Sequence, residues 1–478
     1  MSIAFRGLGR LNTLPLLLIL AALALILAAC GRPADGVMKG ADVEHAIEVL
    51  DAAPTHGFPQ GAFNTKRIAE LSQSEDGKAV AERDRLLRAA LISYAEAQHG
   101  LGLPKASLPK DWGMRPKAYD AEAELDAAIK AGKVREWLDG LAPTAPAYRA
   151  LQEAYGRYLK VAAAGGWPEV PEGSFTPGAT GPAVDALHRR LAAEDAALGE
   201  TPTGVVFDPA LAEAVRRFQA AHGLPTTGQV DAATRTEMNV SAMGRAAQIR
   251  ANLERLRWLP RDEPATRIDV NSAAGLVDYV VDGKISTRLR AAAGKPGDET
   301  PILASTIDSI VINPPWNVPE GIAKEELYPK EAANPGYFAA NDFEEIDGRL
   351  VQKAGPKSAL GLVKFDFDNP YAVYLHDTPS KAAFSQTRRA VSHGCVRVEH
   401  AVGFARMLVT QQPGWSASRF DEVLASGETT AVKLTKPTPV RLMYLTAFPE
   451  NGRIAFRPDV YRWDAELLRL MDGHFGKV

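Results

Sequence analysis

The sequence predicts a multidomain α+β protein, with a helical N-terminal part, a small three-helix module and a β-rich C-terminal half. Its 478 residues are enough for about three domains of average size. Before residue 165, apolar residues recur at three- and four-residue spacings, which is the period of an α-helix. From residue 268 onward, short β-rich runs alternate with Gly, Pro, Asn and Asp, which is typical of strands and turns.

Composition and charge are those of an ordinary globular chain. Hydrophobic residues make up 46% and charged residues 24%, so the chain is neither disordered nor collagen-like. The 55 basic and 58 acidic residues give a net charge of -3. A chain this mildly acidic lacks the basic field of a nucleic-acid binder, so we expect no nucleic-acid partner. The two cysteines, Cys30 and Cys395, exclude a disulfide scaffold and a cysteine-rich zinc site.

The N-terminus has the pattern of an export signal. Arg6 and Arg10 precede an apolar run of fourteen residues, 16–29, and no acidic residue occurs before Asp35. The run is shorter than the roughly 20 residues that a membrane-spanning helix needs. We therefore interpret residues 1–29 as a signal peptide.

The end of this segment, with the letters LAAC closing at Cys30, resembles the lipobox of bacterial lipoproteins. In that family the cysteine is acylated and becomes the first residue of the mature protein. The resemblance implies an exported protein held at the membrane by an N-terminal lipid. Gly31, in place of Asp, favours the outer membrane. Ordinary cleavage that leaves a free thiol and an uncleaved anchor are the alternatives.

Residues 30–165 are predicted to form a helical scaffold domain. The segment 79–97 carries one amphipathic stripe, and two further helical segments follow it. The histidines of this region, His45, His56 and His99, are scattered and form no chemical cluster. We therefore expect this region to support the rest of the chain.

A break rich in glycine and proline follows residue 165, and a compact helical unit is predicted at 174–240. Asp208 and Asp231 are expected to cap its helices, and Gly223 to end one in a left-handed conformation. Several positions resemble the three-helix peptidoglycan-binding module of wall enzymes: Phe218-Gln219, His222-Gly223-Leu224, Gly228 and Thr234. The alternative is a helical packing module that binds nothing.

The remaining chain is predicted as a helical connector at 241–264, a β-rich domain at 265–450 and a C-terminal extension at 451–478. A helix is expected at 401–409 within the β-rich domain. An insertion at about 317–357, punctuated by Gly, Pro and Asn, is long for a loop. Loops of that length are usually functional lids or disordered segments.

A histidine and a cysteine lie close together in the β-rich domain. His376 follows a strand expected at 372–375, and fifteen residues separate it from the run Ser392, His393, Gly394 and Cys395. A thiolate nucleophile needs a neighbouring base, and it needs donors for the oxyanion that forms when a carbonyl is attacked. A histidine at one strand end and a cysteine on an adjoining strand meet the first requirement.

These residues resemble the signature of the L,D-transpeptidases, whose catalytic domains are of the YkuD type. That family usually ends its motif with Cys-x-Asn, whereas here Arg397 stands in the Asn position, as in the large branch typified by YcbB. Further segments resemble the same branch: NLERLRWLP at 252–260, Asn313-Pro314 with Trp316, Leu360-Gly361 with Lys364-Phe365, and YLHDT at 374–378. Together with the scaffold and the binding module, the resemblance spans nearly all of the mature chain.

The resemblance implies a peptidoglycan cross-linking reaction without a metal or organic cofactor. Cys395 would attack the bond between the L-centre of meso-diaminopimelate and the fourth-position D-Ala of a tetrapeptide stem. D-Ala leaves and a thioester remains, and the side-chain amine of a second stem's diaminopimelate resolves it into a 3→3 cross-link. The implied partners are therefore peptidoglycan stem peptides, as tetrapeptide donor and amine acceptor. The thioester must be kept from water, so the insertion is expected to act as a lid.

The catalytic roles follow from the same resemblance. Cys395 is the nucleophile, and His376 is the base toward the thiol and the acid toward the departing amine. Either the backbone carbonyl or the side chain of Asp377 fixes the tautomer of His376. The rival base is His393, which on an extended segment would point to the face opposite Cys395, so we expect it to orient the turn. The amides of Gly394 and Cys395 are candidate oxyanion donors.

Four more residues are expected to shape the substrate site. Tyr374 shares a face with His376 and is a candidate oxyanion donor. Arg397 pairs either with a substrate carboxylate or in a structural ion pair. Ser392 fixes the turn before the cysteine, and Trp316 is either a cleft wall or part of the core.

Other functions fit the residues less well. A papain-like protease normally places its cysteine far upstream of its histidine, the reverse of the order here. A zinc site lacks ligand spacing and a fourth ligand. An L,D-carboxypeptidase, or a relative that attaches proteins to peptidoglycan or cuts its cross-links, would use the same thioester. A non-catalytic wall-binding lipoprotein would leave the histidine-cysteine pair unexplained.

Overall fold

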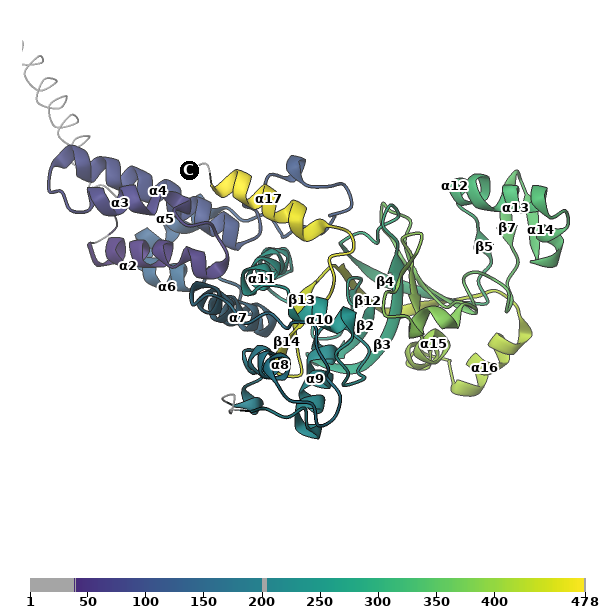
Figure 1. Ribbon diagram of the computed structural model, residues 1–478. Helices are drawn as coiled ribbons and strands as arrows, with labels where there is room; N and C mark the ends of the chain where they lie inside the picture. Colours follow the sequence, from purple (N-terminus) through teal and green to yellow (C-terminus); the bar gives the residue numbers. More distant parts are fainter. Residues whose placement is uncertain (1–37, 39, 200–203, 477–478) are drawn as a thin grey trace, which may run out of the picture.

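The computed structural model describes residues 38, 40–199 and 204–476, drawn in colour in Figure 1 as a helical arm that leads into a β-rich body. The predicted α+β organisation is confirmed. The predicted signal peptide and Cys30 lie outside the described residues. Within the described ranges, no helix combines the length and the apolar character that crossing a membrane requires.

The described part of the N-terminal arm, from residue 40 to 163, contains six α-helices. They are α2 (Gly40–Asp51), α3 (Thr65–Leu71), α4 (Gly77–Gln98), α5 (Ala121–Ala131), α6 (Val134–Asp139) and α7 (Pro146–Ala163), with short 3-10 turns at Ala53–His56, Ala62–Asn64 and Lys105–Ser107. Asp76 begins α4 by accepting the N–H of Lys78 at 3.0 Å, a normal N-cap. The expected apolar stripe of α4 is buried through Leu87, Leu91 and Tyr94.

A second helical unit contains α8 (Pro182–Ala192), α9 (Pro209–Ala221) and α10 (Ala232–Met238). Both predicted caps are present, because Asp208 accepts the N–H of Leu211 at 2.8 Å and Asp231 accepts that of Thr234 at 2.7 Å. Gly223 follows α9 with φ +65°, the left-handed conformation expected there. The three helices surround a hydrophobic core of their own.

The C-terminal half is built on one nine-stranded sheet that closes on itself. Its order is β10-β3-β11-β9-β8-β4-β12-β1-β2, and β2 also pairs with β3. The strands are β1 (Arg267–Asn271), β2 (Leu276–Val281), β3 (Lys284–Gly294), β4 (Leu303–Ile312), β8 (Val363–Phe367), β9 (Leu375–His376), β10 (Ala390–Ser392), β11 (Val396–Val398) and β12 (Thr430–Met443). Two helices, α15 (Ala401–Val409) and α16 (Ala417–Ser426), pack against the core that the sheet encloses.

The insertion after β4 is a folded unit, so the prediction of a long loop is wrong. It contains β5 (Trp316–Asn317), α12 (Glu320–Ile322), a π-turn (Ala323–Leu327), α13 (Tyr328–Ala333), α14 (Tyr337–Ala340), β6 (Phe343–Ile346) and β7 (Arg349–Gln352). Its three strands pair in the order β5-β7-β6. A small core that includes Leu327, Phe343 and Leu350 holds these elements together, and Figure 1 shows them projecting from the body.

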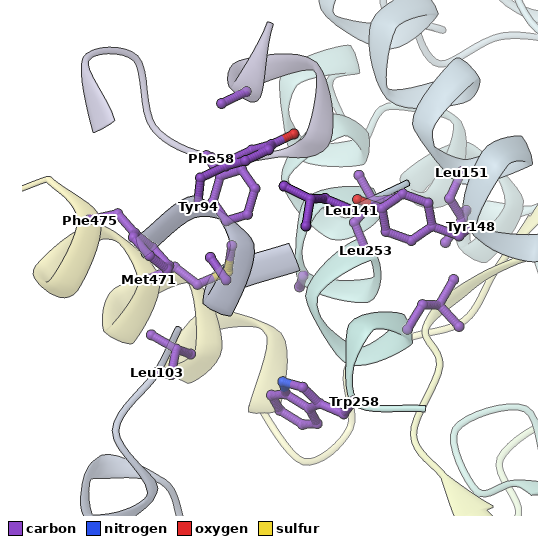
Figure 2. Packing of buried hydrophobic residues seen from close by; sticks show 14 of the residues in the cluster. Phe58, Tyr94, Leu103, Leu141, Tyr148, Leu151, Leu253, Trp258, Met471 and Phe475 are labelled. Carbon is purple, nitrogen blue, oxygen red and sulfur yellow. The ribbon is translucent and has the colours of Figure 1, made fainter. Parts of the chain in front are cut away.

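The helix α11 (Ala242–Arg257) joins the arm to the body. After the sheet, the chain forms the hairpin β13 (Ala447–Glu450) and β14 (Arg453–Phe456) and then returns to the arm as α17 (Trp463–Phe475). Figure 2 shows Phe475 and Met471 of α17 beside Phe58 and Tyr94 of the arm. The rings of Phe58 and Phe475 are 5.3 Å apart, so the C-terminal extension completes the core of the arm.

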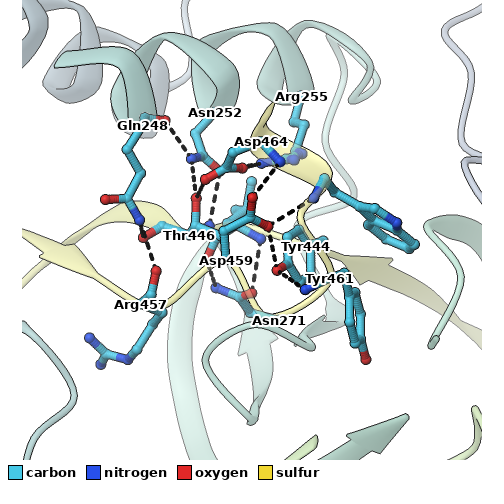
Figure 3. A network of polar contacts seen from close by, with 12 residues as sticks. Gln248, Asn252, Arg255, Asn271, Tyr444, Thr446, Arg457, Asp459, Tyr461 and Asp464 are labelled. Carbon is cyan, nitrogen blue, oxygen red and sulfur yellow. Dashed lines mark hydrogen bonds and ion pairs between the residues drawn. The ribbon is translucent and has the colours of Figure 1, made fainter. Parts of the chain in front are cut away.

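A buried polar network fastens α11 to the C-terminal segment (Figure 3). The side chains of Arg255 and Asp464 form an ion pair, and the Thr446 hydroxyl donates to Asp464 at 2.6 Å. Asn252 donates to the Thr446 hydroxyl at 2.7 Å and accepts its backbone N–H at 3.0 Å. Two of these residues come from the motif at 252–260, so this motif links the domains.

Candidate active site

Two short parallel strands bring the expected catalytic residues to one face. In the register of β9 and β11, Val396 lies opposite Leu375, and Arg397 lies opposite His376. Both Val396 and Leu375 are fully buried in the core of the sheet. Since side chains alternate along a strand, His376 and Arg397 take the other face, together with Cys395, which precedes Val396.

The strand before His376 is shorter than predicted. The predicted strand covers 372–375, but Ala372 has φ +53° and only Leu375–His376 is paired as β9. A residue with positive φ interrupts the hydrogen-bond ladder of a strand, because its N–H and C=O groups no longer point toward the neighbouring strand. Two hydrogen bonds fix the turn instead, in which the Asn369 side chain donates to the Val373 carbonyl and accepts its N–H.

Cys395 lies in a tight turn between β10 and β11. Gly394 has φ +101°, a conformation open to glycine, and the Ser392 hydroxyl donates to the Cys395 carbonyl at 2.5 Å. The local role predicted for Ser392 matches this contact. Among the described residues, the backbone N–H groups of Gly394 and Cys395 have no hydrogen-bond partner. Both are therefore free to bind an oxyanion.

His376 is held by a backbone carbonyl. Its Nδ1–H donates to the carbonyl of Asp377 at 2.5 Å, which leaves the lone pair of Nε2 available as a base. The Asp377 carboxylate faces elsewhere, accepting the N–H of Leu362 at 3.0 Å and pairing with Lys381. Of the two alternatives for orienting the ring, the carbonyl is therefore the one present. Gly361 makes room for the carboxylate, since a Cβ there would lie 2.4 Å from Asp377 Oδ2.

Both members of the histidine-cysteine pair are neutral near pH 7. Burial and the nearby Arg397 lower the pKa of His376 to about 4, although the Asp377 carbonyl opposes this shift. Burial raises the pKa of the Cys395 thiol, although Tyr374, Lys364 and Arg397 act against it. The described residues include no hydrogen bond between the ring and the thiol. A proton must therefore move during the reaction itself.

Tyr374 connects the thiol to the insertion. Its hydroxyl hydrogen-bonds with Cys395 and accepts the indole N–H of Trp316, which begins β5. Burial and the neighbouring thiol raise the pKa of Tyr374 far above its ordinary value, so the hydroxyl keeps its proton. The Lys364 ammonium lies 4.4 Å from the centre of the Tyr374 ring. Trp316 is half-buried and also packs against the small core of the insertion, so it lies between that core and Tyr374.

His393 is turned toward the insertion. The segment 393–395 is bent, so the prediction based on an extended chain does not describe it. The exposed ring donates through Nε2 to Glu326 at 2.6 Å, and Lys295 Nζ lies 3.1 Å from the same nitrogen. Glu326 comes from the π-turn of the insertion. His393 therefore links the turn at residues 393–395, called the catalytic turn below, to the insertion.

Arg397 is a cation with unused donors. None of the described residues forms a hydrogen bond with its guanidinium, and its buried Nε has no partner. Its positive charge lies close enough to His376 and Cys395 to influence both pKa values. A structural ion pair is thus absent from the described part of the chain. The unused donors leave Arg397 able to bind an anion or a carbonyl.

Three contributors to the site were missed by sequence reasoning. Lys364 was noted only as part of a family motif, although it lies beside Tyr374. Glu326 lies in the insertion, and Thr300, which donates to the Gly394 carbonyl, lies after β3. No local pattern marks either residue, because each meets the turn from a distant part of the chain. The described residues contain no group of three or more His, Cys, Asp or Glu placed to hold a metal.

Three family models match the chain. Residues 265–440 match the YkuD "L,D-transpeptidase catalytic domain". Residues 37–154 match a "Scaffold domain", and residues 180–238 match the "Putative peptidoglycan binding domain". These three segments correspond to the sheet, the helical arm and the three-helix unit described above.

Known proteins resemble parts of the chain. A curated protein of Haemophilus influenzae, named "Putative L,D-transpeptidase", is 36% identical over an alignment of 236 residues, which covers 45% of this chain and 48% of that protein. The chain thus spans about half the length of this relative. The Enterococcus faecium L,D-transpeptidase catalytic domain acylated by ertapenem is 15% identical, covering 38% of this chain and 99% of that one, with a TM-score of 0.21. An L,D-transpeptidase from Mycobacterium smegmatis is 17% identical, covering 37% and 58%, with a TM-score of 0.20.

The family models agree with the motifs around His376 and Cys395. They also agree with the predicted binding module and scaffold. The resemblance read from the sequence is therefore confirmed: residues 265–440 match the YkuD family of L,D-transpeptidase catalytic domains, and they are accompanied by segments that match a scaffold domain and a peptidoglycan-binding domain.

Proposed function

We propose that this chain is an L,D-transpeptidase that forms 3→3 cross-links in peptidoglycan through a thioester on Cys395. The observation that carries the proposal is the shared face of β9 and β11, where the thiol, the His376 ring and the free N–H groups of the catalytic turn come together. Acyl transfer needs these three things: a nucleophile, a base and oxyanion donors. The substrate class rests on the family resemblance and on the match to a peptidoglycan-binding domain.

Acylation begins with proton transfer from the thiol to Nε2 of His376. The sulfur attacks the carbonyl between diaminopimelate and D-Ala, a C–S bond forms, and the carbonyl electron pair moves onto oxygen. The N–H groups of Gly394 and Cys395 stabilise this oxyanion. When the carbonyl re-forms, the C–N bond to D-Ala breaks, and His376 returns the proton to the leaving amine.

Deacylation completes the cross-link. The side-chain amine of a second stem attacks the thioester carbon, a C–N bond forms and the C–S bond breaks. His376 accepts a proton from the amine and returns it to the sulfur, which restores the neutral pair. Two contacts support a role for the insertion in excluding water, since Trp316 reaches Tyr374 and Glu326 reaches His393 beside the nucleophile.

The surrounding residues bind the donor stem. Arg397 holds a carboxylate or carbonyl of the substrate, which its unused donors support. The Tyr374 hydroxyl donates to the oxyanion or to the substrate, Trp316 forms a wall of the cleft, and Ser392 holds the turn. His393 orients the turn and is not the base, because its Nε2 is already engaged by Glu326.

The chain works in the cell envelope. The peptidoglycan-binding domain match supports this location, and the sequence pattern of residues 1–29 supports export. We propose that Cys30 carries the lipid anchor and that the anchor inserts in the outer membrane, with the protein on its periplasmic face. The helical arm then holds the catalytic domain away from the anchor.

Incubation with a disaccharide-tetrapeptide, followed by mass analysis of the products, tests the function. A dimer that has lost one D-Ala is the expected product, and Cys395→Ala should form none. Tripeptide without dimer would mean that water is the acceptor and that the enzyme is an L,D-carboxypeptidase. Unchanged tetrapeptide after incubation with folded protein would favour a wall-binding lipoprotein without catalysis. The matched control is Ser426→Ala, on an exposed helix end away from the site.

A further inference from the structure

The loop after β3 passes directly against the catalytic turn. Thr300 in this loop is fully buried, at 0% exposure. Its hydroxyl accepts the N–H of Gly294 at 2.9 Å and lies 2.7 Å from the carbonyl of Gly394. Because the N–H can only donate, the hydroxyl is left to donate its own hydrogen to the Gly394 carbonyl. Both hydrogen bonds are therefore set in direction.

This contact orients the next N–H along the chain. A peptide bond is planar and trans, so the carbonyl of Gly394 and the N–H of Cys395 point in opposite directions across one rigid unit. Holding the carbonyl toward Thr300 therefore holds the N–H of Cys395 away from Thr300. That N–H has no partner within the described ranges. It is thus presented in a fixed direction to an incoming group.

Glycine at position 394 restricts the orientation of its flanking peptides less than any other residue would. Gly394 is buried and has φ +101°, and a Cβ placed on it would meet its nearest atoms at 3.6 to 3.9 Å, an ordinary contact distance. The hydrogen bond from Thr300 adds a directional constraint on this peptide. We propose that Thr300 is a positioning residue that holds the Cys395 N–H as an oxyanion donor.

A second residue holds Thr300 in position. The Tyr461 hydroxyl donates to the Gly294 carbonyl at 2.6 Å and accepts the N–H of Thr300 at 3.4 Å. Its ring stacks on Tyr444 at 4.8 Å, and Tyr444 donates to Asp459 at 2.8 Å, within the network of Figure 3. The support of the turn therefore extends through Tyr461 into the network that joins α11 to the body.

The close approach of these segments is built into the backbone. A Cβ on Gly294 would lie 2.0 Å from the carbonyl oxygen of Asp298, so only glycine lets the loop fold back on β3. Gly294 also lies opposite Ser392 in the pairing of β3 with β10. The loop therefore starts beside β10, the strand that leads into the turn at 393–395.

Two rates measured on the whole enzyme separate positioning from general structure. Acylation of Cys395 by a carbapenem passes through an oxyanion, whereas alkylation by iodoacetamide displaces iodide from a saturated carbon and forms none. We expect Thr300→Val to slow acylation about 10- to 100-fold, since a small misplacement of an oxyanion donor has effects of this size. Alkylation should stay within about twofold of the parent enzyme, and Thr300→Ser, which keeps the hydroxyl, should recover most of the acylation rate.

A second variant keeps the test decisive if valine at this position prevents folding. Tyr461→Phe leaves the Thr300 hydroxyl in place and removes only its support, so a smaller loss confined to acylation is expected. The inference rests on the proposed function, and the two fail differently. An unmodified protein that alkylates but does not acylate contradicts the function. A folded Thr300→Val that acylates at the parent rate, or loses both rates in parallel without recovery in Thr300→Ser, overturns the positioning role.

Discussion

Alkylation of Cys395 should accelerate steeply with pH, because the resting thiol carries its proton. Burial raises the pKa of this thiol, and the imidazole of His376, with a pKa of about 4, is neutral well below pH 7. The resting enzyme therefore differs from one with a preformed thiolate–imidazolium pair. Below the pKa of a thiol, each pH unit changes the thiolate fraction about tenfold. The rate with iodoacetamide should thus rise about 100-fold between pH 6 and pH 8.

Intact-protein mass gives this rate directly, since Cys395 and Cys30 are the only two cysteines of the sequence. Cys395→Ala supplies the baseline. A rate that is flat between pH 5 and pH 8 would refute the reasoning, because an ion pair formed at low pH keeps the thiolate fraction constant over that range. The acylation rate, by contrast, should fall as the pH drops through about 4, where His376 takes up a proton and can no longer act as a base.

Substitution of each histidine extends the same experiment. His376→Ala should lower carbapenem acylation by about 10²–10⁴-fold, the usual contribution of a positioned acid-base group. His393→Ala should keep more activity, because it removes the contacts to Glu326 and Lys295 and leaves the base in place. Rapid acylation of His376→Ala, together with none in a folded His393→Ala, would move the base to the turn itself.

Four further outcomes can be checked separately. Asp464→Ala should lower the free energy of unfolding by about 3–5 kcal/mol in urea denaturation, because Arg255 is left buried without its partner; a loss under about 1 kcal/mol would show that the ion pair is dispensable. Gly361→Ala should lower the free energy of unfolding by about 1–3 kcal/mol and slow acylation, because Gly361 has φ +61° and a Cβ at this position would clash with Asp377. Melting curves that match those of the parent would contradict this prediction. Acidification from pH 7.5 to pH 5 should lower the free energy of unfolding by about 2 kcal/mol through His222. Burial lowers the pKa of this side chain to about 3 in the folded protein, so from about pH 6.5 downward the unfolded chain takes up the proton and the folded one does not. An unchanged pH dependence in a His222→Leu variant would argue against this prediction. Cys30→Ala should abolish labelling with a fatty-acid probe, and unchanged labelling would reject the lipid anchor.

Sequence patterns predicted the fold well where the structure of a segment depends on neighbouring residues in the sequence. The caps at Asp208 and Asp231 and the left-handed Gly223 are properties of a few consecutive residues, and all three are present. The insertion at 317–357 was misjudged because its strands are only two to four residues long. Strands this short carry little periodicity, and they are held by a small core that forms only after folding.

The candidate site was predictable to the extent that it is contiguous. The run from Ser392 to Cys395 and its partner His376 lie within one short stretch of sequence, and parallel pairing places them on one face. The choice between the carbonyl and the carboxylate of Asp377 depends on where Leu362 and Lys381 meet it, which sequence spacing does not encode. Thr300 approaches from the loop between β3 and β4, so its contact depends on how the sheet brings this loop to the turn.

The packing of α17 on the arm has a consequence for how the protein matures. A chain is synthesised from its N-terminus, so the first helices emerge from the ribosome long before the helix that covers Phe58. Until Phe475 arrives, Phe58 lacks one of its ring partners and Phe63 lacks the same neighbour, 5.9 Å away in the finished structure. The part of the chain that is synthesised first is therefore covered by the helix that is synthesised last. Until translation ends, this apolar surface is exposed to chaperones, and we expect a chain that ends just before α17 to be degraded faster than the full-length chain.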